Sequence, residues 1–71
     1  MIVIDARGMH PPEPFERVMA ALDDLVPGDR IVLVLDREPT PLYRVLRQNG
    51  YAYRADWDAD RTKCEISIWQ P

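Results

Sequence analysis

The chain is predicted to fold as an α/β two-layer sandwich, with a mixed four-stranded sheet and two helices on one face. Two observations predict this class. Apolar residues recur at helical spacing in two segments, and four further segments are β-branched or alternate between apolar and polar, in the order β-α-β-α-β-β. Two helices cannot cover both faces of four strands, so one face is expected to stay partly open. The 71 residues are expected to form a single domain, residues 1–71.

The first half of the chain predicts a strand, a helix and a second strand. Residues 2–4 form a β-branched run that Arg7-Gly8 closes. A helix is expected from about residue 12 to 25, because apolar residues there recur on one helix face, and Val-Pro-Gly-Asp at 26–29 stops it. Residues 31–35 are all aliphatic, which is typical of a strand inside a sheet. Because a helix joins the two strands, they are expected to be parallel.

The second half predicts a short helix and an antiparallel hairpin. Thr40-Pro41 is expected to place a cap at Thr40 and the first helical residue at Pro41, and Asn49-Gly50 ends this helix. Residues 51–57 and 63–69 each alternate apolar and polar side chains, which predicts two strands. Asp58-Ala59-Asp60-Arg61 between them is expected to form the hairpin loop.

Three prolines cluster where the first helix is expected to begin. Pro11 is expected near the cap, Pro12 at the first helical position and Pro14 at the third. Proline is tolerated there, because the first N–H groups of a helix have no partner inside it. The same prolines remove donors that would otherwise hold a phosphate, and Glu13 adds negative charge. This helix end is therefore not expected to bind anions.

Residues 4–15, IDARGMHPPEPF, resemble the signature of TusA-like (SirA-like) domains. That signature is a strand ending in Asp-x-Arg-Gly, two residues, and Cys-Pro-x-Pro at the start of the first helix. The resemblance covers nearly the whole chain and implies the same two-layer sandwich. Pro11 stands at the position of the family's cysteine, which carries persulfide sulfur in the sulfur-relay members. The positions that match are Asp5, Arg7, Gly8, Pro12, Glu13 and Pro14.

The variant Gly-x-x-Pro-Pro-Glu-Pro points to one branch of this superfamily. Together with the later segment at residues 37–43, it resembles a Cys-less branch of bacterial domains of unknown function. That branch sometimes occurs beside hemerythrin-like domains. The resemblance identifies the branch but implies no activity, because a fold does not determine a function.

The candidate binding loop lies between the first strand and the first helix. Asp5 and Arg7 occupy alternate positions and are expected to pair and stabilise the loop. His10 is the only histidine and cannot build a metal site alone, so it is expected to be solvated, and neither a metal nor a cofactor is predicted. The loop is predicted to comprise Asp5, Arg7, His10, Pro11, Pro12, Glu13 and Pro14.

Two further residues are functional candidates, one on each face of the last predicted strand. Cys64 shares its face with Ile66 and Ile68, so this lone thiol is expected to be buried and inert, with a raised pKa. Trp69 lies on the other face and is expected to mark a possible partner surface with Val32 and Val34.

The composition of the chain argues against several classes of partner and location. The net charge is −3, from nine basic and twelve acidic residues with no basic block, which argues against nucleic acid and anionic membranes as partners. The longest aliphatic run is far shorter than the roughly 20 residues of a membrane span. A strand-like start and a single cysteine favour the cytoplasm.

No nucleophile–base pair can be assembled, so the chain is not expected to be an enzyme. The predicted function is a non-catalytic binding or accessory module, whose partner is another protein or a second copy of the chain. Two alternatives stay open. One is a sulfur-relay protein that carries persulfide on Cys64, and the other is a metal- or haem-linked redox accessory domain in which His10 acts with a partner.

Overall fold

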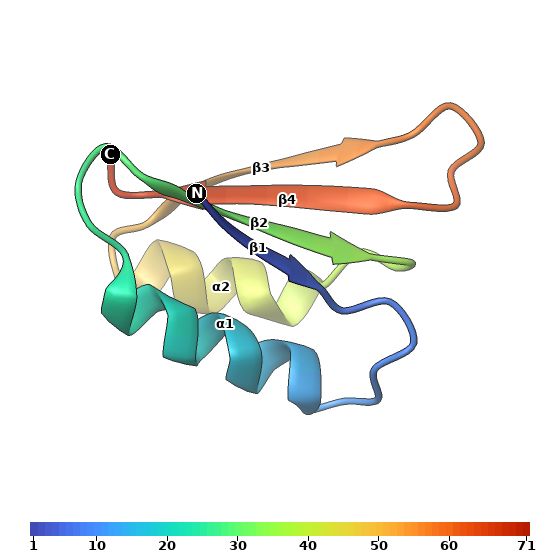
Figure 1. Ribbon diagram of the computed structural model, residues 1–71, viewed down its shortest axis with the longest axis horizontal. Helices are drawn as coiled ribbons and strands as arrows, with labels where there is room; N and C mark the ends of the chain where they lie inside the picture. Colours follow the sequence, from blue (N-terminus) through green and yellow to red (C-terminus); the bar gives the residue numbers. More distant parts are fainter.

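The computed structural model describes all 71 residues and confirms the predicted fold class. Four strands form one mixed sheet, and both helices lie on the same face of it (Figure 1). The elements are β1 (Ile2–Asp5), α1 (Glu13–Asp24), β2 (Arg30–Leu35), α2 (Thr40–Gln48), β3 (Ala52–Trp57) and β4 (Cys64–Trp69). The strand order is β1-β2-β4-β3, in which β1 and β2 are parallel and β4 is antiparallel to both of its neighbours.

The core lies between the sheet and the two helices. Leu33 of β2 pairs in register with Ile4 on one side and with Ile66 of β4 on the other, so these side chains point to the same face. The helices close this layer with Val18 from α1 and Leu46 from α2, both fully buried. Every buried side-chain polar atom has a hydrogen-bond partner. The aliphatic run predicted at 31–35 is thus a strand between two others, as expected for residues with little access to water.

Both helices begin one residue away from the predicted position. Pro12 is the cap of α1, so Glu13 is its first residue and Pro14 its second, whereas the sequence predicted Pro12 as the first. Pro39, rather than Thr40, precedes α2, because Thr40 makes no capping hydrogen bond and already lies in the helix. A proline at the second helical position costs no more than one at the first, since neither N–H has a partner inside the helix.

The opposite face of the sheet carries no helix. The register places Val3, Val32, Ser67 and Arg54 in one row across this open face. Val3 is 59% exposed. Neither helix is long and apolar enough to cross a lipid bilayer.

Candidate functional site

A pocket of about 400 Å³ opens between the first turns of α1 and α2, over the end of β2. Both helices start at this end of the sheet, because each follows a parallel strand that ends there (Figure 1). Leu33 and Leu35 contribute to it from the sheet. We call it the proline groove, and its lining residues are Pro11, Pro12, Pro14, Phe15, Leu33, Leu35, Arg37, Glu38, Pro39, Pro41 and Leu42.

The groove is almost entirely apolar. Five of the seven prolines in the chain line it, and Arg37 and Glu38 are its only charged residues. Proline rings offer no N–H donor and little conformational freedom, so the walls are rigid and lose little entropy when a ligand binds. Phe15 is 38% exposed, and it is the only Phe, Tyr or Trp side chain of the chain that is exposed. Such a surface is suited to apolar groups and poorly suited to anions.

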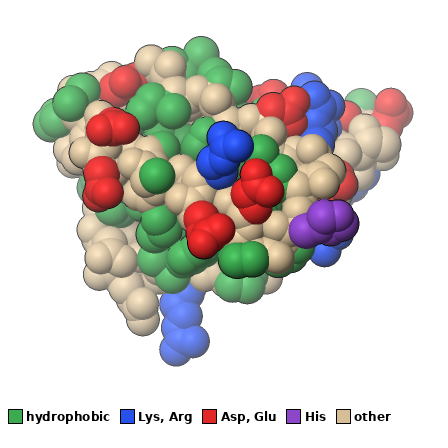
Figure 2. Space-filling view, turned by 60° about the horizontal axis from the view of Figure 1, so that its bottom comes forward, with side chains coloured by type: hydrophobic (Ala, Val, Ile, Leu, Met, Phe, Trp, Pro, Cys, Tyr) green, Lys and Arg blue, Asp and Glu red, His purple; other side chains and the backbone are tan.

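The sequence predicted a binding loop rather than a groove, and residues of that loop form only one wall of the groove. Pro11, Pro12 and Pro14 were predicted binding-loop residues, and all three line it. Phe15 and the second wall, residues 37–42, were not predicted as site residues. The signal that could have found the second wall is the repeated Pro-x-Pro pattern, at 12–14 and again at 39–41. Figure 2 shows hydrophobic side chains reaching the surface between charged ones on the helix side of the molecule.

A tyrosine pair holds the acidic residue of the groove in place. The Tyr43 hydroxyl donates a hydrogen bond to Glu38 Oε1 at 3.0 Å. The Tyr43 ring is buried and stacks on the Tyr53 ring, with centroids 4.4 Å apart and planes 3° from parallel. Arg47 donates a hydrogen bond to the Tyr53 hydroxyl. Burial, and then the hydrogen bond to Glu38, raise the pKa of Tyr43, so its hydroxyl remains a donor at physiological pH.

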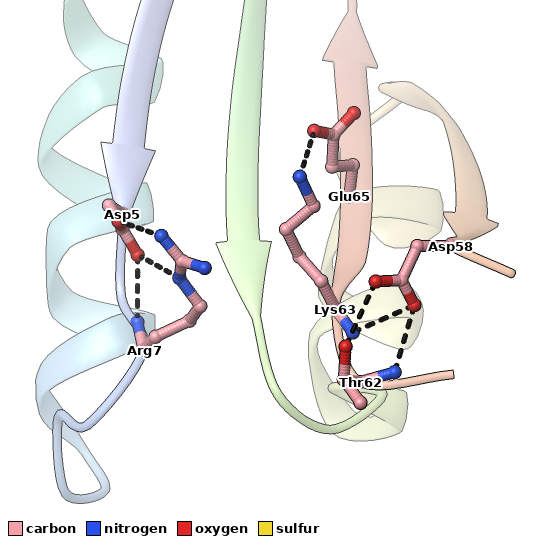
Figure 3. A network of polar contacts seen from close by, with 6 residues as sticks. All are labelled: Asp5, Arg7, Asp58, Thr62, Lys63 and Glu65. Atoms are coloured by element: carbon pink, nitrogen blue, oxygen red, sulfur yellow. Dashed lines mark hydrogen bonds and ion pairs between the residues drawn. The ribbon is translucent and has the colours of Figure 1, made fainter. Parts of the chain in front are cut away.

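Asp5 and Arg7 form the predicted pair, but outside the groove. Arg7 Nε donates to Asp5 Oδ1 at 3.0 Å, Arg7 Nη2 donates to Oδ2 at 2.8 Å, and the Arg7 backbone N–H also donates to Oδ1 at 3.2 Å (Figure 3). Lys63 and Glu65 form an ion pair on the other side of β2. Between them, Val34 is only 8% exposed although it faces away from the helices, because Asp5 and Glu65 are its register partners.

The Asp5–Arg7 pair makes a pH-dependent prediction. Hydrogen bonds from Arg7 lower the pKa of Asp5 from 3.8 to about 2. Because this pKa lies below the unfolded value, the pair stabilises the fold above that value, and the effect is lost as the pH falls from near 4 through 2. Replacing Arg7→Gln should return the pKa of Asp5 towards its ordinary value, as read from its carboxyl ¹³C shift. Arg30→Gln is the matched control, and an unchanged Asp5 titration in the Arg7 variant would contradict the assignment.

The other predicted candidates are not brought together. His10 is exposed, and its side chain makes no hydrogen bond. The Glu13 carboxylate pairs with Arg17 at 3.5 Å, one turn along α1, while Asp5 is occupied by Arg7. No group of three or more His, Cys, Asp or Glu side chains is placed to hold a metal ion. The loop therefore contributes its prolines to the groove, and its charged residues lie apart.

Cys64 and Trp69 lie on opposite faces of β4. Cys64 is 0% exposed, and burial, followed by the charges of Glu38 and Asp56, raises the pKa of its thiol. A persulfide carrier needs an accessible thiolate, which this position does not provide. Trp69 is half-buried and lines a hollow of about 370 Å³ together with polar residues that include Arg30 and Arg54. The open face is thus more polar around Trp69 than the groove is around Phe15.

Comparisons with known proteins agree with the sequence resemblance. A family model described as "Uncharacterized conserved protein (DUF2249)" matches residues 3–70. The crystal structure of a SirA-like protein from Desulfitobacterium hafniense is similar, with 27% sequence identity and a TM-score of 0.83, over 96% of this chain and 95% of that chain. A search of curated proteins finds no match. The predicted resemblance to SirA-like domains is confirmed.

Proposed function

We propose that this chain, which belongs to the family of uncharacterized conserved proteins DUF2249 and has the SirA-like fold, is a protein-binding module. Its proline groove binds an apolar segment of a partner protein, and the chain itself carries out no reaction. The observation that supports this proposal is the apolar lining of the groove around the exposed Phe15.

Pro11 is central to this proposal. It stands at the position of the cysteine in the motif that residues 4–15 resemble, at the mouth of α1. There it contributes a ring to the groove wall instead of a thiol. A cysteine at this position would be reactive. The proline that stands there instead forms part of an apolar contact surface. Cys64, the only thiol of the chain, is buried in the core between the sheet and the helices, so no observation favours the sulfur-carrier alternative.

The groove also indicates what the partner segment looks like. The groove volume of about 400 Å³ lies near the lower end of the roughly 300–1,000 Å³ that ligand pockets in proteins span. The groove therefore accommodates only one or two large side chains of a partner. Arg37 and Glu38, the charged lining residues, bring one positive and one negative group. We therefore expect the partner to present a short segment with aliphatic or aromatic anchor residues. Residues of positive or negative charge flank these anchors. Aromatic anchors in rigid apolar pockets commonly dominate the affinity of such contacts.

Two matched variants test the proposal. Phe15→Glu places a charge in the groove, and Val26→Glu places the same charge at another exposed apolar residue that lies outside it. We expect the wild type and the Val26→Glu variant to capture the same proteins from a lysate of the native host. The Phe15→Glu variant should not capture them. For an isolated partner, the Phe15 variant should cost about 2 kcal/mol of binding free energy, as for an interface hot spot. Equal binding by both variants, or no captured protein at all, would contradict the groove as the binding site.

A further inference from the structure

β3 is an edge strand that nothing covers. It pairs with β4 on one side only, and no other element lies along its outer side (Figure 1). Its six residues leave backbone N–H and C=O groups free to pair with another strand. Proteins usually protect such an edge with a covering loop, a proline, a bulge or charged side chains. β3 contains no proline, and its two charged residues, Arg54 and Asp56, have opposite signs, so they can attract a second strand of complementary charge.

We propose that two copies of the chain pair through this edge, with β3 antiparallel to the partner's β3 about a two-fold axis at Ala55. The two four-stranded sheets then form one continuous sheet, with the helices of both copies on the same side. This contact is isologous, as expected for a two-fold dimer.

The charges on β3 select this register. Arg54 and Asp56 both face the open side of the sheet, because their β4 partners are Ser67 and Glu65. With the axis at Ala55, Arg54 lies opposite the partner's Asp56, and Asp56 lies opposite the partner's Arg54. An axis at Arg54 or at Asp56 would place two like charges directly opposite each other, which is destabilising. On the helix side, the same register places Tyr53 opposite the partner's Trp57.

The residues involved are free to change partners. Arg54 and Asp56 are exposed and pair only with each other along the same strand, with Arg54 Nε 3.2 Å from a carboxylate oxygen. Such an exposed pair contributes little to stability, so exchanging the one pair within each copy for two pairs between the two copies costs little. The Ala55 side chain at the axis is small, so the two β3 strands can approach each other there.

The other edge lacks these properties. β1 has four residues, and its charged residue on the open side, Asp5, is already held by Arg7. A two-fold axis at Ile4 would place Val3 opposite the partner's Asp5, which gives no charge complementarity. Because β3 contributes no residue to the proline groove, the dimer is independent of the proposed binding site.

Charge reversal tests both the contact and its register. Sedimentation velocity from micromolar to millimolar concentration should show a concentration-dependent dimer for the wild type. Arg54→Asp and Asp56→Arg should each weaken it about tenfold or more, because each turns two attractive pairs into repulsive ones. The double variant Arg54→Asp/Asp56→Arg should dimerise like the wild type. A mixture of the two single variants should form the heterodimer, in which both cross-strand pairs are again attractive.

Controls separate this contact from a general effect of charge. Arg17→Asp and Asp23→Arg make the same charge changes on the exposed side of α1, and should leave dimerisation unchanged. In the wild type, amide exchange of β3, but not of β1, should slow with rising concentration. A wild type that stays monomeric at all concentrations would overturn the proposal. Single variants that dimerise normally, or a double variant that does not recover, would also overturn it.

Discussion

Replacing Ile66→Ala is expected to lower the free energy of unfolding by about 2–5 kcal/mol. Ile66 is fully buried at the middle of β4, where its register partners are Leu33 on one side and Ala55 on the other. Truncation would leave a cavity between the sheet and the helices, and neither neighbouring strand can move in without breaking its pairing. A chain of this length has only about 4–10 kcal/mol of stability in total, so a large share would be lost.

Urea unfolding followed by circular dichroism measures this effect. Ser67→Ala is the matched control, because Ser67 follows Ile66 directly but faces the open side of the sheet. Its expected cost is within about 0.5 kcal/mol, as for surface substitutions away from special features. Equal destabilisation by the two variants would show that the assigned faces of β4 are wrong.

Tyr43→Ala is expected to cost about 3–5 kcal/mol, as for other buried aromatic residues. This substitution removes a buried ring, its stacking on Tyr53, and the hydrogen bond to Glu38. Tyr43→Phe keeps the ring and removes only the hydroxyl, so it should cost about 1 kcal/mol. The difference between the two variants therefore separates ring packing from the hydrogen bond.

The same urea transitions check this prediction, and a near-equal cost for the two variants would contradict the role of the stacked ring. Tyr43→Phe should also free the Glu38 carboxylate while the fold stays intact. The ¹³C shift of that carboxyl group would report the change. If it stays unchanged, the hydrogen bond seen at 3.0 Å does not form in solution.

Local patterns were sufficient to predict the fold class, but not the strand order β1-β2-β4-β3. The alternation at 51–57 and 63–69 places each side chain on a face, because a strand has a period of two, and the register confirms these faces from Tyr53 to Trp69. The helix starts were less accurate by one residue, because a Pro-x-Pro sequence is compatible with more than one position in the first turn. The Asp5–Arg7 pair was predicted because both residues belong to one strand end and its loop.

The groove could not be predicted in the same way. It forms only where residues 11–15 meet residues 37–42, and these segments are brought together by the crossover between β1 and β2. No periodicity within either segment contains that information. Trp69 shows the same limit, since its face was predicted but its burial depends on neighbours such as Arg30 and Gln70 in the hollow around it.

The positions of the chain ends have a practical consequence. Both termini lie at the end of the sheet away from the first turns of α1 and α2 (Figure 1). A linker, an affinity tag or a further polypeptide fused at Met1 or Pro71 would therefore extend away from Phe15 and leave that surface accessible. Immobilising the protein through either end is accordingly expected to orient the groove towards solution.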